Sequence, residues 1–256
     1  MRPGLMLAAV LVLLAGPVRA ADITIEQVRA ALAAHTLAGH GANFAGRSLE
    51  GLDLSHLDLS GANLAGADLQ RVKLVGANLT GANLSGARMN LAWIMGADFT
   101  RANLSNAILE TLVVSAGMET KPDEAARFVE ANLAGAHLMA RFALDDMRRA
   151  NLSGVLAAAD MRNQSMGLIR TDFSGANLGG ADFAGAELGY ASFRFARLAG
   201  TNFSGASLLH ADFSGADLSG ADLTGADATG ADFEAANLAD AKGLDSVKGF
   251  SPPTAR

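Results

Sequence analysis

Large apolar side chains recur at every fifth position along two long stretches of the chain. The first stretch runs from Phe44 to Val114 and the second from Phe173 to Leu238, with Ala228 as the one small residue in the second series. Alanine usually stands two residues before the large side chain and Asn or Asp directly before it, while Ser or Thr and then Gly commonly follow. A five-residue period matches neither an α-helix nor a β-strand, so the backbone must turn after each repeat.

This period predicts a narrow coil made of short, straight sides. The large side chain and the alanine would point inward, and the other three residues of each repeat would face water. A second large side chain on each side would overfill so thin an interior, which explains the alanine. Gly and Ser suit the tight corners, and stacked coils would hydrogen-bond through their backbones about 4.8 Å apart, as adjacent strands do.

The repeat A-(D/N)-L-x-x, which covers roughly residues 42 to 242, resembles the signature of the pentapeptide-repeat family. The resemblance implies an all-β solenoid, the right-handed quadrilateral β-helix, with four repeats and hence 20 residues in each coil. The residues agree with four sides, because a step of 20 aligns phenylalanine with phenylalanine and asparagine with asparagine, whereas a three-sided coil would stack Phe on Leu. The aligned sets are Phe173, Phe193, Phe213 and Phe233, and Asn43, Asn63, Asn83 and Asn103.

Both ends of such a coil need covers, since open ends invite edge pairing. Thr24 to Gln27 reads as a capping box, and an apolar stripe follows, so we expect a capping helix near residues 25–34. Lys242 to Phe250 predicts a short helical turn that ends before Pro252-Pro253.

Two interruptions break the five-residue register. Ser115 to Arg127 contains a helix-start pattern with Pro122 in the first turn, and the repeat degrades from Met139 to Thr171, where we expect an irregular but still coiled middle. Each interruption is either a neutral insertion, which costs little at a surface, or a recognition loop on a rigid scaffold. The predicted divisions are a signal peptide (1–20), an N-terminal capping helix and junction (21–41), regular repeats (42–114), an inserted loop that includes a possible short helix (115–130), irregular repeats (131–172), regular repeats (173–242) and a C-terminal cap and tail (243–256).

The first twenty residues read as a secretion signal. Arg2 gives a positive start, Leu5 to Leu14 is apolar, and small residues precede a cleavage site near Ala20-Ala21. The apolar run is too short for a spanning helix, which needs roughly twenty residues, although an uncleaved anchor is the alternative. The mature protein is therefore expected to be periplasmic or secreted, with no membrane span after signal removal.

Charge and composition narrow the function classes. Without Arg2 and Arg19 the chain carries 18 basic and 26 acidic residues, a net charge of −8, which disfavours nucleic-acid binding. There is no cysteine, so disulfides and thiolate metal sites are excluded. Ser55, His56 and Asp58 are close in sequence, but nothing indicates an oxyanion hole. We predict a protein that is not an enzyme, with no catalytic residues, cofactor or metal.

Two groups of side chains at outward positions are candidates for binding a protein partner, because exposed aromatic and Arg side chains are typical interface anchors. The first group surrounds Ile94 and the second carries His210 stacked over Tyr190. The alternative for the first group is that the 115–127 loop folds back over it. A homodimer through a coil end is a further possibility. The candidate residues are Leu91, Trp93, Met95 and Val113 in the first group, and Tyr190, Arg194, Phe195 and Arg197 in the second.

The leading functional hypothesis is a non-catalytic exported repeat scaffold that mediates protein–protein interaction, with an unknown protein partner. The alternative follows from the family resemblance, since some pentapeptide-repeat proteins mimic duplex DNA and interact with DNA gyrase. An exported protein would not meet a cytoplasmic enzyme, so this alternative requires that the signal peptide is not used.

Overall fold

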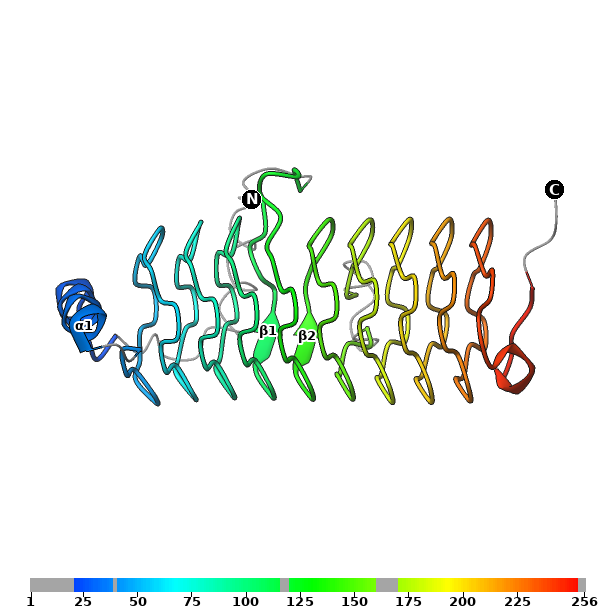
Figure 1. Cartoon of the computed structure of the whole chain (residues 1–256), viewed down its shortest axis with the longest axis horizontal. Helices are drawn as coiled ribbons and strands as arrows, with labels where there is room; N and C mark the ends of the chain where they lie inside the picture. The colour runs from blue at the N-terminus through cyan, green and yellow to red at the C-terminus, as the bar shows by residue number, and fades with distance from the viewer. Residues whose placement is uncertain (1–20, 39–40, 116–119, 160–169, 253–256) are drawn as a thin grey trace, which may run out of the picture.

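The computed structural model describes residues 21–38, 41–115, 120–159 and 170–252, and the predicted signal peptide lies outside these ranges. The described chain forms one elongated coil with a helix across its first end (Figure 1). The named elements are few, because most sides of the coil are too short to count as strands. They are the helix α1 (Ile25–Ala38), the strands β1 (Ile108–Glu110) and β2 (His137–Met139), which pair in parallel, and the 3-10 turn η2 (Leu244–Ser246).

Parallel bridges join residues 20 apart through the regular parts of the chain, as in Asn43 to Asn63 and Asn63 to Asn83. This spacing confirms the right-handed quadrilateral β-helix expected from the repeat. We number the four sides of the coil by the bridging residues of its first turn. Side 1 starts with Asn43, side 2 with Ser48, side 3 with Asp53 and side 4 with Asp58.

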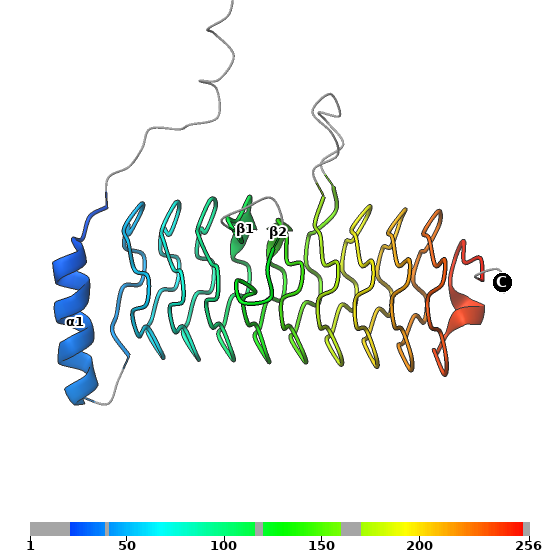
Figure 2. The same ribbon diagram turned by 90° about the horizontal axis from the view of Figure 1, so that it is seen from above.

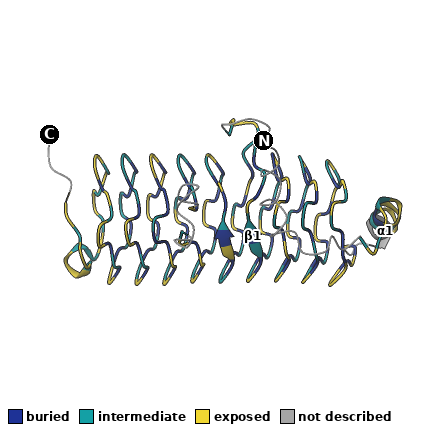
Figure 3. Ribbon diagram, turned by 180° about the vertical axis from the view of Figure 1, so that it is seen from behind, coloured by how far each residue is buried: buried dark blue, intermediate teal, exposed yellow. Residues whose placement is uncertain are grey.

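The core is a stack of large side chains inside the coil, and buried residues recur in every turn of the ribbon (Figure 3). Leu64, Leu84 and Leu104 are fully buried above one another, and the alanines two residues before them are buried as well. The predicted phenylalanine column is confirmed, because the rings of Phe173, Phe193, Phe213 and Phe233 stack with centroids 4.9–5.1 Å apart. Neighbouring phenylalanine columns meet edge to face, the second geometry that aromatic pairs prefer.

The polar residue before each large side chain has a structural role besides solvation. Its side-chain oxygen accepts a hydrogen bond from the backbone N–H two residues later, as Asn63 does from Ala65 at 3.2 Å. Along side 1 the asparagines also bond to one another from coil to coil, with Asn63 Nδ2 donating to Asn43 Oδ1 at 3.1 Å. The recurrent Asn or Asp therefore closes the corner turn and, on side 1, ties the coils together.

Both ends of the coil are covered. α1 lies across the first end (Figure 2), and its Val28 is fully buried against the core. The capping box is confirmed by reciprocal bonds, with Thr24 N donating to Gln27 Oε1 and Gln27 N to Thr24 Oγ1. The helix extends to Ala38, four residues beyond its predicted end. At the other end, η2 provides the expected turn and Phe250 packs edge to face on Phe233.

The first interruption lies between sides 3 and 4. Val113 on side 3 and Arg127 on side 4 are 14 residues apart, where the regular step is five. Residues 122–124 form a turn in the described part of this insertion. The coil has already resumed at Arg127, and Phe128 is buried in the core, so the coil restarts inside the range predicted for the loop.

The middle of the chain is more regular than its sequence indicates. Phe142, Met147 and Leu152 hold the predicted frame and are fully buried. One step between neighbouring sides has four residues and not the regular five, from His137 on side 2 to Arg141 on side 3. A second insertion follows Leu156 on side 2, since side 3 is next reached only at Asp172; residues 160–169 of this segment lie outside the described ranges.

Candidate interaction surface

Exposed large hydrophobic side chains gather on side 3 and on the two corners that border it. Five of the six such residues of the described chain lie there, and Leu156 on side 2 is the exception. Side 1, which is opposite, instead carries the hydrogen-bonded asparagines. The two remaining sides bear mostly polar residues at their bridging positions. The five residues are Leu91, Trp93, Leu144, Phe195 and Leu209.

The first predicted group centres on Trp93, whose residue is 38% exposed on side 3. Its backbone bridges Lys73 in one coil and Val113 in the next, and the Lys73 ammonium lies 5.8 Å from the ring centroid, within cation–π range. Leu91 occupies the corner beside it and is also exposed. Trp93 and Leu91 thus remain partly exposed to solvent, with Lys73 beside the indole ring.

Met95 was predicted to point outward, and this was wrong, because the residue is buried with 9% exposure. The returning arm of the first insertion reaches the neighbouring residue, where Gly96 N donates to Glu124 O at 2.8 Å. That arm is tied down in turn by Ser115 Oγ, which donates to Glu124 Oε2 at 2.7 Å. The insertion therefore shields Met95 while Trp93 and Leu91 stay exposed.

The second predicted group lies on the same side of the coil, at its two corners. Tyr190 and His210 stack at the corner between sides 2 and 3, with ring centroids 4.8 Å apart, as expected from their 20-residue separation. Phe195, at the corner between sides 3 and 4, is 65% exposed. Its ring lies over Gly215, where an added Cβ would come within 2.5 Å of the ring, so this glycine makes room for the phenylalanine.

Arginine side chains border this second group. The Arg194 guanidinium lies 5.7 Å from the Phe195 ring centroid and pairs with Asp212 at 3.9 Å. Arg197 is exposed on side 4 and bridges Asp217 through the backbone. The carboxylate of Asp217 accepts a hydrogen bond from Asn237 at 2.9 Å. Whether either group binds a partner stays a prediction.

The two groups belong to one surface, which sequence reasoning missed. From Trp93, side 3 is bridged to Val113, and after a break it resumes at Arg141 and is bridged through Asp172 to Ser192. Four coil steps at about 4.8 Å place the groups roughly 19 Å apart along the same side. The insertions hid this alignment, because each adds a number of residues that is not a multiple of 20 and so shifts the register read from the sequence.

A cleft lies between the two groups. It has a volume of about 580 Å³ and opens on side 3 between Val113 and Arg141. The short step at residues 137–141 and the two insertions flank it, and these departures from the repeat create the space. The described lining consists of Thr111, Leu112, Val113, Val114, Ser115, Met139, Ala140, Arg141, Arg170 and Asp172.

A buried carboxyl group holds the first insertion beside this surface. Asp145 is 1% exposed, in a position that alanine occupies in most repeats. Its Oδ1 accepts a hydrogen bond from Ala126 N at 2.8 Å, at the point where the insertion rejoins the coil. Burial raises the pKa of this carboxyl to about 8, although the bond from Ala126 lowers it. A sequence signal existed, namely an Asp in the alanine position two residues before Met147.

Within the described residues, no group of three or more His, Asp or Glu side chains could hold a metal ion. No helix in the same part of the chain is long and apolar enough to cross a membrane.

Comparison with known proteins shows which family model matches the chain. The family model for pentapeptide repeats matches eight copies, over residues 40–74, 73–110, 168–205, 186–225 and 216–242. No curated protein matches. Proteins of this family are generally structural or interaction proteins and not enzymes.

Several solved structures are similar to this chain. HetL, a pentapeptide repeat protein involved in heterocyst differentiation regulation in the cyanobacterium Nostoc, is 28% identical, with 91% of this chain and 100% of that chain covered and a TM-score of 0.47. QnrB1, a plasmid-mediated fluoroquinolone resistance protein, is 22% identical over 79% of this chain and 89% of that chain, with a TM-score of 0.32. A pentapeptide repeat protein of the Arabidopsis thaliana thylakoid lumen is 24% identical over 60% and 67%, with a TM-score of 0.26. The family match spans more than half of the sequence, and the chain belongs to the pentapeptide-repeat family.

Proposed function

We propose that this protein is a non-catalytic, exported scaffold that holds a protein partner along side 3 of its coil. The observation that carries the proposal is the distribution of exposed hydrophobic side chains, five of six on side 3 and its corners. Isolated exposed hydrophobic residues need no explanation, but a group of them along one side marks an interaction site.

The chemistry of this side suits protein contacts. Trp, Tyr and Arg are the residues that most often dominate binding energy at protein interfaces, and side 3 with its corners presents Trp93, Tyr190 and Arg194. The coil beneath them is filled with stacked side chains, so the partner meets a surface whose shape is set before binding, which lowers the entropic cost of association.

Export is the second part of the proposal and rests on the leader-like sequence of Met1 to Ala20. Fractionation of the native host, followed by N-terminal sequencing, is expected to find a protein that begins at Ala21 outside the cytoplasm. A full-length protein in the cytoplasm would contradict export and favour the duplex-mimicking alternative.

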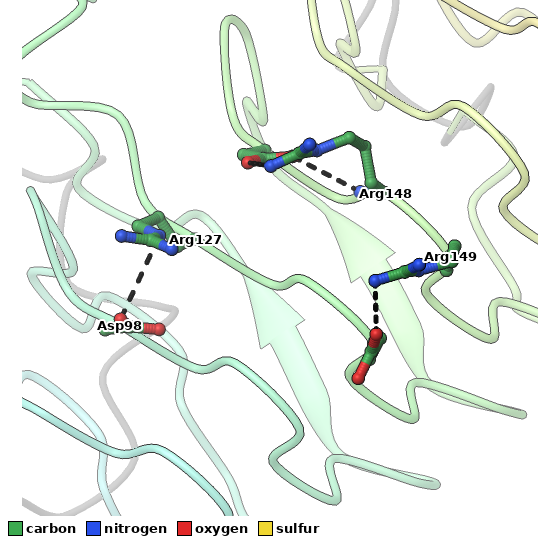
Figure 4. Close-up of polar contacts among 6 residues, drawn as sticks. Asp98, Arg127, Arg148 and Arg149 are labelled. Atoms are coloured by element: carbon green, nitrogen blue, oxygen red, sulfur yellow. Dashed lines mark hydrogen bonds and ion pairs between the residues drawn. The ribbon is translucent and has the colours of Figure 1, made fainter.

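The charge pattern of side 4 disfavours that alternative. A mimic of duplex DNA needs regular lines of uncompensated acidic groups, but in the middle of side 4 arginines stand among the acidic residues and pair with them (Figure 4). Arg127 pairs with Asp98 at 3.9 Å, and Arg148 pairs with Asp146 at 2.8 Å. At the neighbouring corner Glu130 lies between Arg101 and Arg149 and pairs with both.

The test of the binding surface is partner capture from extracts of the native host with purified mature protein. Trp93→Ala and Phe195→Ala are each expected to reduce capture of the partner about tenfold, because both remove an exposed aromatic anchor. Leu156→Ala is the matched control, since Leu156 is 46% exposed but lies on side 2. Equal capture by all variants, or an equal loss with the Leu156 control, would contradict side 3 as the binding surface.

A further inference from the structure

The cleft on side 3 has a floor and a rim of different chemistry. We call its apolar lining residues, Leu112, Val113, Val114, Met139 and Ala140, the floor and its charged ones, Arg141, Arg170 and Asp172, the rim; Thr111 and Ser115 complete the described lining. In the described chain, parallel bridges run along side 3 from Asp53 to Val113 and again from Arg141 to Asp232, and none joins Val113 to Arg141. The cleft therefore occupies the place where two consecutive sides of the coil part.

The rim has an excess of positive charge within an acidic protein. Arg141 Nε lies 3.9 Å from Asp172 Oδ2, so these two charges compensate each other. Arg170 is exposed and forms no ion pair with any other described residue. Among the described rim residues one guanidinium, that of Arg170, is thus left over beside an apolar floor, while the whole chain has a net charge of −6. An anionic group is the complement of this rim, and a guanidinium binds carboxylate in a two-pronged geometry.

We propose that this cleft binds an extended, acidic segment of the partner protein, with a carboxylate on Arg170 and apolar side chains on the floor. The proposal rests on the proposed function and names the chemistry of the partner. The cleft volume lies within the range of pockets that hold a small ligand or a few side chains.

The shape of the site favours an extended segment. Residues 111–115 and 139–141, which belong to consecutive coils, line it, and Thr111 N donates to Met139 O at 2.8 Å where the two segments meet. A peptide laid between them would run alongside extended backbone and present alternate side chains to the floor and to the rim. Trp93 and the Tyr190–His210 pair lie on the same side, beyond the two walls of the cleft along the coil axis, so other parts of the partner could contact them.

The test uses the mature protein and fluorescein-labelled seven-residue peptides in a fluorescence anisotropy titration. The probe alternates Leu and Glu and is amidated at its C-terminus, and the comparison peptide replaces each Glu by Gln. We expect the acidic peptide to bind at least about tenfold more tightly than the amide peptide. A Gln peptide with a free C-terminus shows whether a chain end supplies the carboxylate as well as a side chain does.

Charge reversal locates the binding. Arg170→Glu is expected to weaken binding of the acidic peptide at least about tenfold. Arg29→Glu is the matched control, because it makes the same charge change on the exposed surface of α1, beside Asp53 and three coil steps from Val113. Circular dichroism checks that both variants are folded. Failure of the acidic peptide to bind, equal affinity for the two peptides, or an equal loss with the Arg29 variant would overturn the proposal.

The two proposals fail separately. If Arg170→Glu leaves partner capture unchanged while Trp93→Ala and Phe195→Ala reduce it, the acidic segment is wrong and the side 3 surface stands. If peptide binding depends on Arg170 while neither aromatic substitution affects capture, the cleft stands and the larger surface is wrong.

Discussion

Asp145 replaces an alanine whose role in other repeats is to point inward and fill little space. Its carboxyl accepts a hydrogen bond from Ala126 N. This N–H needs an acceptor because Ala126 follows the insertion and not a regular corner. In regular corners that N–H bonds to the carbonyl three residues earlier, as Ala97 does to Ile94. One buried acid thus repairs the backbone hydrogen bonding where the repeat is broken.

The raised pKa of Asp145 predicts a dependence of stability on pH. Below its unfolded value of 3.8 the carboxyl is protonated in both states, and between 3.8 and about 8 the folded protein keeps a proton that the unfolded chain has lost. The contribution of Asp145 to the free energy of unfolding therefore decreases as pH rises through this window and levels off above pH 8.

Asp145→Asn removes this ionisation while keeping the acceptor for Ala126. Urea unfolding at pH 5, 7 and 9 is expected to show the variant gaining stability relative to the natural protein as pH increases. Asp146→Asn is the control, because the bond from Arg148 holds the pKa of Asp146 below its usual range and leaves it ionised throughout. A constant difference for Asp145→Asn across the three pH values would contradict the raised pKa.

At the scale of elements, α1 shows how a solenoid end is closed. The helix is anchored by the Thr24–Gln27 capping box and by Val28, which is fully buried on the first coil. The capping box fixed where the helix begins and was readable from four residues. Its end at Ala38 was missed, because the apolar stripe that placed the helix stops at Leu32, although Gly39 directly after Ala38 is a typical helix stop signal.

Val28→Asp is expected to detach α1 from the first coil. Loss of the buried side chain should lower the free energy of unfolding by about 2–3 kcal/mol, and burial of the new charge should lower it further. The uncovered end should also promote self-association. Denaturant unfolding and sedimentation velocity measure the two effects. Ala30→Asp, on the exposed surface of the same helix, should leave both unchanged, and an equal effect of the two substitutions would rule out capping as the cause.

At the scale of the whole molecule, the break in side 3 divides the coil into two regular blocks. Sides 1, 2 and 4 remain bridged across it, through Asn103 to Asn132, Ile108 to His137 and Asp98 to Arg127. In a repeat protein each coil is stabilised mainly by its neighbours, so a junction that lacks one side should open more often than a regular coil.

Hydrogen exchange measured by mass spectrometry tests this expectation. Peptides that cover residues 108–114 and 137–142 should exchange faster than peptides from residues 61–85, whose coils are bridged on all four sides. Equal protection in the two regions would show that three bridged sides hold the junction as firmly as four.

The sequence predicted the coil well because its physical cause is local and repeated. Each large residue at every fifth position from Leu49 to Leu109 must fit the same narrow interior, and every one is buried. The surface was harder to predict. Trp93 and Tyr190 were recognisable as unusual outward residues, but their common side depends on loop lengths that do not follow the period. The burial of Met95 and the cleft beside Arg141 come from how the insertions return, which no repeat encodes.

The coils are stacked along the long axis of the molecule (Figure 1), and backbone hydrogen bonds join each coil to the next, as from Leu64 N to Asn83 O and from Leu84 N to Asn103 O. Tension applied between the two termini would therefore strain these bonds end-on, one coil after another. Each detached turn would release 20 residues, up to about 70 Å of extended chain. A load pressing on one wall is instead spread over many coils at once. The molecule is built to resist bending and crushing, and it would yield to pulling by unwinding from its ends.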